Sequence, residues 1–212
     1  MSDAKYIPAL RFGWLTPVYD PALRRMMPET ALKQTLIAQA QITAGQRVLD
    51  LGAGTGTLTI MLKQAQPDAE VVGLDGDPAI LARARHKAAA ASAAIRFDYG
   101  LATALPYDDA SFDRVLSSLM LHHLTTEDKG RALREAWRVL RPGGELHILD
   151  FGPPQNAVAL LIAQVLRRLE PTADHIAGRL PALIRQAGFT AVAQTAQRMT
   201  IIGTLALYRG RK

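Results

Sequence analysis

Val48-Leu49-Asp50-Leu51-Gly52-Ala53-Gly54-Thr55-Gly56-Thr57 is the stretch of this chain that decides its fold. An apolar segment ends in an acid and enters a Gly-x-Gly-x-Gly turn, and an amphipathic stretch that predicts a helix follows. Glycine lets the backbone bend tightly and lets a ligand approach with no Cβ in the way. The stretch therefore predicts a strand, a turn and a helix, with a nucleotide-type ligand against exposed N–H groups of the turn.

Asp50 separates the two cofactor classes that use such a turn. A dinucleotide brings a pyrophosphate to the start of the helix, where a neighbouring carboxylate would repel it. S-adenosylmethionine (AdoMet) brings an ammonium and a sulfonium and no phosphate, so an acid is tolerated or useful there. The dinucleotide fingerprint also requires Gly or Ala where this chain has Thr57. Both observations favour AdoMet.

A second acid stands at the end of the next predicted strand. Val71-Val72-Gly73-Leu74-Asp75 has the pattern of a strand that presents a carboxylate to ribose hydroxyls. The alternative for Asp75 is a cap or turn residue. Asp77-Pro78 follows and predicts a helix N-cap with proline at the first helical position.

Further motifs extend this pattern: Leu105-Pro106-Tyr107, Ser111-Phe112-Asp113 and the run from Arg138 to Gly144. With them the chain resembles the class I AdoMet-dependent methyltransferases, from about Gln46 to Gly152. Leu121-His122-His123-Leu124 and Asp150-Phe151 look most like the ubiquinone/menaquinone-biosynthesis C-methyltransferases and their small-molecule relatives. The resemblance implies a doubly wound α/β fold of the Rossmann-like type. Its seven-stranded sheet would be mostly parallel, with the last strand antiparallel.

Bulk properties bound the class of protein. The chain has 212 residues, enough for one α/β domain. It has no cysteine, which excludes disulfides, thiolate metal sites and a cysteine nucleophile, and which fits a cytoplasmic protein. The longest apolar run, Ala157 to Ala163, is far shorter than the ~20 residues of a membrane span. The net charge of +6 indicates either solubility or an anionic partner such as RNA, a membrane surface or an acidic substrate. Aromatic residues do not interleave with the basic groups, so nucleic acid is not favoured.

Strands and helices are expected to alternate through the central part of the chain. The expected strands are Arg47–Leu51, Glu70–Leu74, Ile95–Asp98, Arg114–Ser118 and Glu145–Asp150, with a closing pair at Ala191–Thr200 and Gly203–Arg209. The expected helices are Ala31–Gln41, Thr57–Gln66, Pro78–Ala91, Thr126–Leu140, Ala157–Leu169 and Arg179–Gln186, and Thr125 is a possible cap. One globular domain results: a lid and helix over residues 1–40, then the AdoMet-binding part over 41–212 with a cap near 153–180.

The resemblance implies roles for particular residues at the cofactor. Gly52, Ala53 and Gly54 would cradle the methionine part, and Asp75 the ribose. Gly76, Leu101 and Ala102 would frame the adenine, and the backbone of Ser118 and Leu119 would lie near the methionine amine. Tyr19, in Val18-Tyr19-Asp20, resembles a lid tyrosine that reaches the methionine carboxylate; the alternative is that the N-terminal aromatics cover the sheet edge.

Leu101 departs from the common pattern. Many relatives have Gly-Asp-Ala there, with the Asp accepting a bond from the adenine amino group, and Leu101 cannot accept that bond. Weaker AdoMet affinity or a compensating acceptor is therefore expected.

Transfer of a methyl group to a carbon or to a phenol is helped by a general base that removes a proton from the acceptor. His122 and His123 are adjacent, and either could be a general base, with His123 favoured; the alternative is that they pack or cap a helix. Asp150, at the end of its strand, could orient a substrate hydroxyl or bind a loop amide. No His, Asp and Glu residues at helical spacing predict a metal site. The chain also lacks the Asn/Asp-Pro-Pro-Tyr/Phe motif of enzymes that methylate planar nitrogens.

The segment Ala157 to Leu166 is apolar around most of a helical circumference, so it is either buried or lines an apolar site. The second interpretation predicts a prenylated quinol or a lipid as substrate, with Arg167-Arg168 near anionic headgroups. We therefore expect a methyltransferase that acts at carbon or oxygen of a small, apolar acceptor. The alternatives are an RNA or protein methyltransferase and a non-catalytic AdoMet-binding domain.

Overall fold

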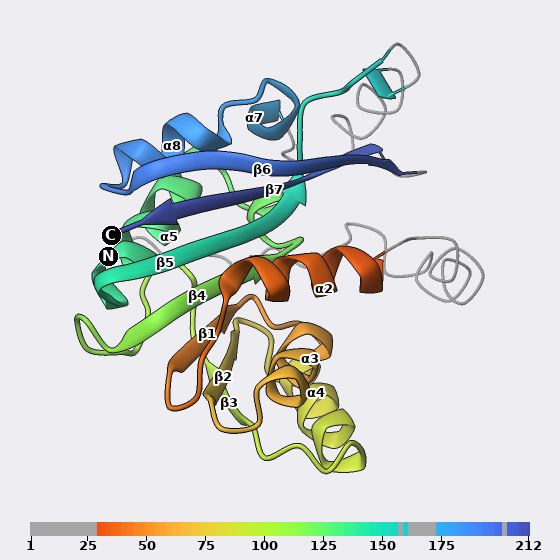
Figure 1. The fold of residues 1–212 in the computed structure, drawn as a ribbon, viewed down its shortest axis with the longest axis vertical. Coiled ribbons are helices and arrows are strands. Elements are labelled where there is room, and N and C mark those ends of the chain that lie inside the picture. The colour runs from red at the N-terminus through yellow and green to blue at the C-terminus, as the bar shows by residue number, and fades with distance from the viewer. Residues whose placement is uncertain (1–28, 157–158, 161–172, 201–202) are drawn as a thin grey trace.

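The computed structural model describes residues 29–156, 159–160, 173–200 and 203–212. Its centre is a seven-stranded sheet in the order β3-β2-β1-β4-β5-β7-β6 (Figure 1). The strands pair in parallel from β3 through β5, and β7 runs antiparallel to both β5 and β6. The mostly parallel, doubly wound sheet with an antiparallel last strand is thus confirmed.

Strands and helices alternate as expected up to β5. The strands are β1 (Arg47–Leu51), β2 (Glu70–Asp75), β3 (Arg96–Tyr99), β4 (Phe112–Ser118), β5 (Leu140–Phe151), β6 (Thr190–Thr200) and β7 (Gly203–Arg211). The helices are α2 (Glu29–Ala40), α3 (Thr57–Ala65), α4 (Pro78–Ala90), the 3-10 turn η1 (Leu121–His123), α5 (Thr126–Val139), α7 (Ala173–Ile176) and α8 (Leu180–Gln186).

Alternating side chains divide the core into two layers. Helices α2, α3 and α4 cover one face of the sheet, and α5, α7 and α8 cover the other (Figure 1). On β5, Leu149 packs in the first layer and Ile148 in the second, as the period of two in a strand requires. Any polar side chain near a strand end therefore belongs to a definite layer, which its position along the strand fixes.

The expected boundaries of β5 are wrong. The sequence Arg141-Pro142-Gly143-Gly144 predicts a turn before the strand, but β5 already begins at Leu140. Gly143 has a φ of +78°, and the pairing between β4 and β5 shifts register between Phe112 and Arg114. A glycine in the left-handed region lets a strand carry a bulge. The strand therefore continues through residues whose composition indicates a turn.

Two predicted helix caps are confirmed. The Asp77 side chain accepts hydrogen bonds from the N–H groups of Ala79 and Ile80, with Pro78 at the first helical position. The Thr125 hydroxyl accepts from the N–H of Asp128 at 3.1 Å. Each cap satisfies N–H groups that a helix start leaves unpaired. Both helices, α4 and α5, therefore begin where the sequence places them.

The domain organisation stays a prediction. Residues 1–28, which carry the expected lid and Tyr19, lie outside the described residues, as does most of the expected cap helix. In the described ranges, no helix is both long and apolar enough to cross a membrane.

His147, on β5, is fully buried in the layer beneath α2. Its Nδ1 lies 3.0 Å from Nε2 of Gln39, which also donates to the carbonyl of Tyr208 at 3.2 Å. Because the amide nitrogen donates, His147 accepts at Nδ1 and carries its proton at Nε2. Burial, together with the charges of Arg114 and Arg209, lowers the pKa of His147 to about 3. This histidine is therefore neutral in the folded protein at neutral pH.

The depressed pKa of His147 predicts acid sensitivity. The ordinary pKa of a histidine is 6.5. As the pH falls below that value, His147 becomes protonated in the unfolded chain but stays neutral in the folded protein. The His147→Asn variant keeps an acceptor near Nδ1 but does not titrate. Between pH 7 and pH 4.5, wild type should lose about 2.5 kcal/mol more of its free energy of unfolding than the variant. Urea titrations at both pH values measure this, and equal losses in the two proteins would contradict it.

Candidate active site

The glycine turn after β1 is tied to the end of β2. The N–H groups of Gly52 and Ala53 both donate to the carbonyl of Leu74, each at 2.9 Å, and the N–H of Gly54 donates to Oδ2 of Asp75 at 2.8 Å. In this structure these three N–H groups are therefore used within the protein, and the expected role of Gly52, Ala53 and Gly54 at the methionine part stays a prediction. A pyrophosphate would need these N–H groups, whereas a ligand without phosphate does not.

Asp75 is the residue at which the parts of the proposed cofactor site meet. Its other oxygen, Oδ1, accepts from the N–H of Asp77 at 3.0 Å, and its backbone carbonyl accepts from the N–H of Gly100 at 3.1 Å. The carboxylate is half-buried and can accept further bonds, since each oxygen has two acceptor positions. Gly76 follows it directly, and the Gly100 bond brings the half-buried Leu101 and Ala102 to the same end of the sheet.

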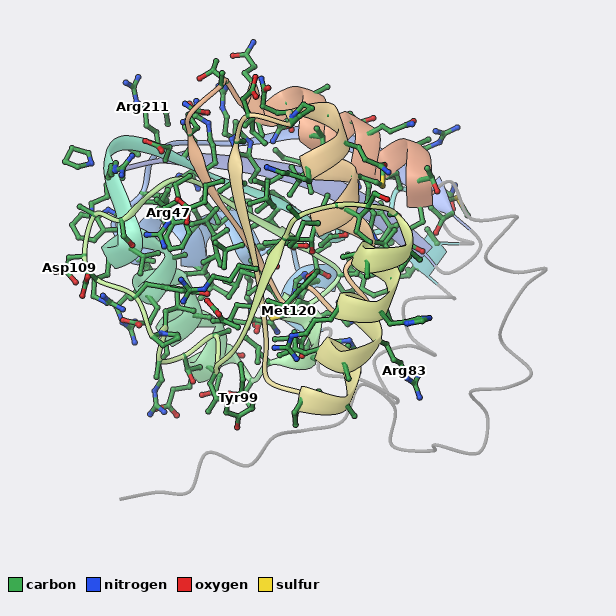
Figure 2. All side chains as sticks on the ribbon, turned by 90° about the horizontal axis from the view of Figure 1, so that it is seen from below. Arg47, Arg83, Tyr99, Asp109, Met120 and Arg211 are labelled. Atoms are coloured by element: carbon green, nitrogen blue, oxygen red, sulfur yellow. The ribbon has the colours of Figure 1, made fainter. Side chains whose placement is uncertain are left out.

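Met120, just after β4, closes over the glycine turn. Gly52 has a φ of +78°, and a Cβ added to it would lie 2.3 Å from Cγ of Met120. Figure 2 shows Met120 surrounded by other side chains, whereas Tyr99 and Arg83 point outward at the periphery. A ligand lying on Gly52 would therefore contact Met120 as well, a contact that the sequence analysis missed.

The end of β4 carries a strained backbone position. Leu119 has a φ of +56°, and its N–H donates to the carbonyl of Leu149 at 2.8 Å. Within the described ranges, the buried Oγ of the preceding Ser118 has no hydrogen-bond partner. A left-handed conformation at a non-glycine residue is unfavourable and is typical of functional sites. The place of Ser118 and Leu119 beside the methionine amine, which the resemblance implies, stays a prediction.

Asp50 lies beneath the turn rather than on it. Its side chain is 1% exposed, and the hydroxyl of Thr59 on α3 donates to Oδ2 at 2.6 Å. Burial raises the pKa of Asp50 to about 6, although the Thr59 bond and the charge of Lys33 oppose that shift. Asp50 is therefore a buried group in the α2–α3 layer that would act on a bound cation through its charge.

The candidate catalytic residues His122 and Asp150 form a hydrogen-bonded pair in the opposite layer. Nδ1 of His122 is 2.8 Å from Oδ1 of Asp150, and the N–H of His122 donates to Oδ2 at 3.3 Å. Both side chains are buried. Of the two roles considered for Asp150, the contact with a loop amide is the one that the structure shows. His123 is half-buried, and its ring packs on that of His122 at a centroid distance of 4.0 Å.

A third histidine joins this pair. His175 on α7 is fully buried; its Nδ1 is 3.1 Å from the carbonyl of Phe151 and 3.8 Å from Oδ1 of Asp150. The sequence analysis missed it, because it lies 25 residues beyond Asp150 and belongs to no recognisable motif. Only its place in the expected cap region, near residues 153–180, could have drawn attention to it.

The structure thus brings the described candidate residues to one end of the sheet. Bonds join the Gly100 loop to Asp75, the glycine turn to β2, and η1 to β5. Tyr19 is the exception, because it lies outside the described residues. Among the residues that the structure describes, no three His, Asp or Glu side chains are grouped so that they could hold a metal ion.

The known proteins that this chain resembles in sequence are methyltransferases. The profile of a methyltransferase domain family matches residues 48–144. A demethylmenaquinone methyltransferase of Deinococcus radiodurans is 39% identical over 150 residues, which are 69% of this chain and 61% of that protein. The enzyme of the same name from Thermus thermophilus is 39% identical over 73% of this chain and 70% of its own length. The apo structure of the S-adenosylmethionine-dependent methyltransferase SibL superposes with a TM-score of 0.70, at 25% identity, over 87% of this chain and 55% of that one.

Gly52 offers a test of the contact with Met120. Gly52→Ala adds a Cβ both at a positive φ and 2.3 Å from Met120, whereas Gly45→Ala, at a φ of +77°, meets nothing within 4 Å. Backbone strain of about 1–2 kcal/mol is common to both variants. Overpacking should therefore make Gly52→Ala less stable than Gly45→Ala by a further 1–3 kcal/mol or so.

The double variant Gly52→Ala/Met120→Gly should recover most of that difference relative to Met120→Gly alone, because it removes both Cγ and Cβ of Met120, which lie 2.3 and 2.7 Å from the added Cβ. The measurement is the free energy of unfolding in urea for all five proteins. Equal losses for Gly45→Ala and Gly52→Ala would contradict the packing of Met120 on the turn.

Proposed function

This chain belongs to the S-adenosylmethionine-dependent methyltransferases, and we propose that it methylates a small, apolar, quinol-like acceptor at carbon or oxygen. The chain spans 61% and 70% of the lengths of the two demethylmenaquinone methyltransferases described above. The acceptor of this chain is therefore a proposal. The single observation that carries the proposal is the buried His122–Asp150 pair. A phenolic or carbon acceptor must lose a proton, and this pair can take it.

The residues at the carboxyl end of the sheet fit AdoMet. Asp75 can accept from ribose hydroxyls, and Asp50 supplies a negative charge on the side of the cationic methionine part. When bound, AdoMet supplies a methyl group already activated on a sulfonium. The protein's own part is then to position the acceptor and to hold a proton.

AdoMet would supply the methyl group to the acceptor atom and would leave as a thioether, with the electron pair of the broken bond on sulfur. The proton of the acceptor goes to Nε2 of His122, whose Nδ1–H is held by Asp150. The imidazolium that results lies beside a carboxylate and is stabilised by it. His123, which the sequence analysis favoured for this role, packs its ring on that of His122, and we propose that it supports that ring.

The acceptor class can be tested directly. The probes are reduced demethylated quinols with short and long prenyl tails, a mixed RNA and a denatured protein extract, each incubated with the chain and AdoMet that carries a labelled methyl group. The proposal predicts label in the quinols, more efficient transfer to the longer-tailed ones, and loss of transfer in His122→Gln. Label confined to RNA or protein would contradict it, and so would AdoMet binding without transfer to any probe.

Asp75 should govern cofactor affinity. In Asp75→Asn the neutral amide accepts a ribose bond more weakly than a carboxylate, because hydrogen bonds to charged groups contribute about 1.5–3 kcal/mol. AdoMet affinity should therefore fall about 10- to 100-fold in calorimetric titrations. The matched control is Asp77→Asn, two residues away, because Asn is as good a helix cap as Asp. Its affinity should equal that of wild type, and equal losses in both variants would contradict a specific role for Asp75.

Asp50 should make AdoMet affinity depend on pH. Its pKa is raised to about 6, so it is mostly ionised at pH 7 and mostly protonated at pH 5. If its charge attracts the cationic methionine part, affinity should weaken about tenfold between pH 7 and pH 5. In Asp50→Asn this dependence should be nearly absent. Calorimetry at both pH values checks this, and parallel curves for the two proteins would contradict the role proposed for Asp50.

A further inference from the structure

Asp150 stands between two imidazoles that come from distant parts of the chain. His122 of η1 approaches Oδ1 at 2.8 Å, and His175 of α7 approaches the same oxygen at 3.8 Å. The two rings are nearly perpendicular, with centroids 6.4 Å apart. All three side chains are buried, so water does not screen their interactions as it would at a surface.

The partners fix the tautomer of each ring. The carboxylate of Asp150 only accepts, so His122 carries a proton at Nδ1. The carbonyl of Phe151 also only accepts, so Nδ1 of His175 carries a proton too. Both N–H dipoles therefore point toward the end of β5 and favour a negative charge on Asp150. Nε2 of His175 is buried with no hydrogen-bond partner in the part of the chain that the structure describes.

The surrounding charges keep the roles of the two rings distinct. Burial raises the pKa of Asp150, but the two histidines outweigh it and hold that pKa well below its usual value. Burial lowers the pKa of His175, and the charge of Lys129 on α5 lowers it further, against the pull of Asp150. Lys129 itself lies 3.3 Å from Asp174. Asp150 is therefore ionised and His175 is neutral at neutral pH.

Three further side chains surround the His122–Asp150 pair. Tyr208 of β7 is fully buried, and burial together with the charge of Asp150 raises the pKa of its hydroxyl. His123 packs its ring on His122, and Phe151 packs edge-on against the same ring at 4.9 Å.

We infer that His175 is a positioning residue for methyl transfer: its Nδ1–H donates to the carbonyl of Phe151 and lies 3.8 Å from Oδ1 of Asp150, and the dipole of this N–H stabilises the Asp150 carboxylate and so sets how strongly the His122–Asp150 pair holds the proton of the acceptor. This inference rests on the proposed function for its catalytic consequence. Without the donor of His175, the carboxylate becomes more basic and the pair keeps its proton to a higher pH. In the variant, His122 is then already protonated, and cannot take a proton from the acceptor, over a pH range in which the wild-type pair is deprotonated.

The first arm of the test does not depend on an acceptor. The chain has five histidines, so their ring signals can be assigned by single substitutions and followed by NMR from pH 5 to pH 9. In His175→Phe the titration midpoint of His122 should rise by about one pH unit. It should return toward wild type in His175→Asn, whose amide places a donor near the position of Nδ1. The control is His147→Phe, which alters a buried histidine of β5 that packs in the other layer.

The second arm is the pH profile of kcat with a quinol acceptor. The acidic limb should move upward in His175→Phe by the same amount as the NMR midpoint, return in His175→Asn and stay in place in His147→Phe, with KM for AdoMet unchanged. An unmoved His122 midpoint in His175→Phe would overturn the inference, and so would a moved midpoint with an unmoved acidic limb. No turnover of any quinol, with the midpoint moved as expected, would contradict the proposed function and leave the electrostatic link between His175 and the pair standing.

Discussion

The carbonyl of Leu74 and the carboxylate of Asp75 hold the functional end of this protein together. They accept the N–H groups of three successive turn residues, Gly52 to Gly54, and so bind the turn after β1 to the end of β2. Polar backbone groups near a core must be paired, and here the pairing is made between neighbouring strands. The start of α3, the loop at Gly100 and the contact of Met120 with the turn all take their positions from it. A turn built in this way presents a carboxylate, rather than a row of free N–H groups, to its ligand.

Much of this arrangement is predictable from local sequence. The Gly-x-Gly-x-Gly turn, the acids at the ends of β1 and β2, and the caps at Asp77 and Thr125 depend on residues within a few positions of each other. Such features follow from backbone geometry and from hydrogen bonds between near neighbours. The alternation of strands and helices then leaves few possible topologies. The mostly parallel sheet and its antiparallel last strand follow from the resemblance, whereas the order of the strands was not predicted.

Features that depend on distant contacts could not be predicted in this way. The direction of the turn N–H groups depends on Leu74, which lies more than 20 residues farther along. The early start of β5 depends on pairing with β4 across a bulge, which overrides the turn signal of Pro142 and Gly143. His175 has no local pattern, and its importance comes only from its distance to Asp150. The burial of Asp50 could likewise not be predicted from the sequence, because it depends on Thr59 and on the helices that cover it.

The two acids at the strand ends face opposite layers of the sheet: Asp50 bonds to Thr59 beneath α2 and α3, and Asp150 bonds to His122 beneath α5 and α7. Under the proposed function, the sheet therefore separates the layer that binds the cofactor from the layer that meets the acceptor. The segment that matches the methyltransferase profile, residues 48–144, contains Asp50 and stops before Asp150 and His175. With the roles divided in this way, the acceptor layer can diverge in evolution, or be exchanged by design, while the cofactor layer stays as it is.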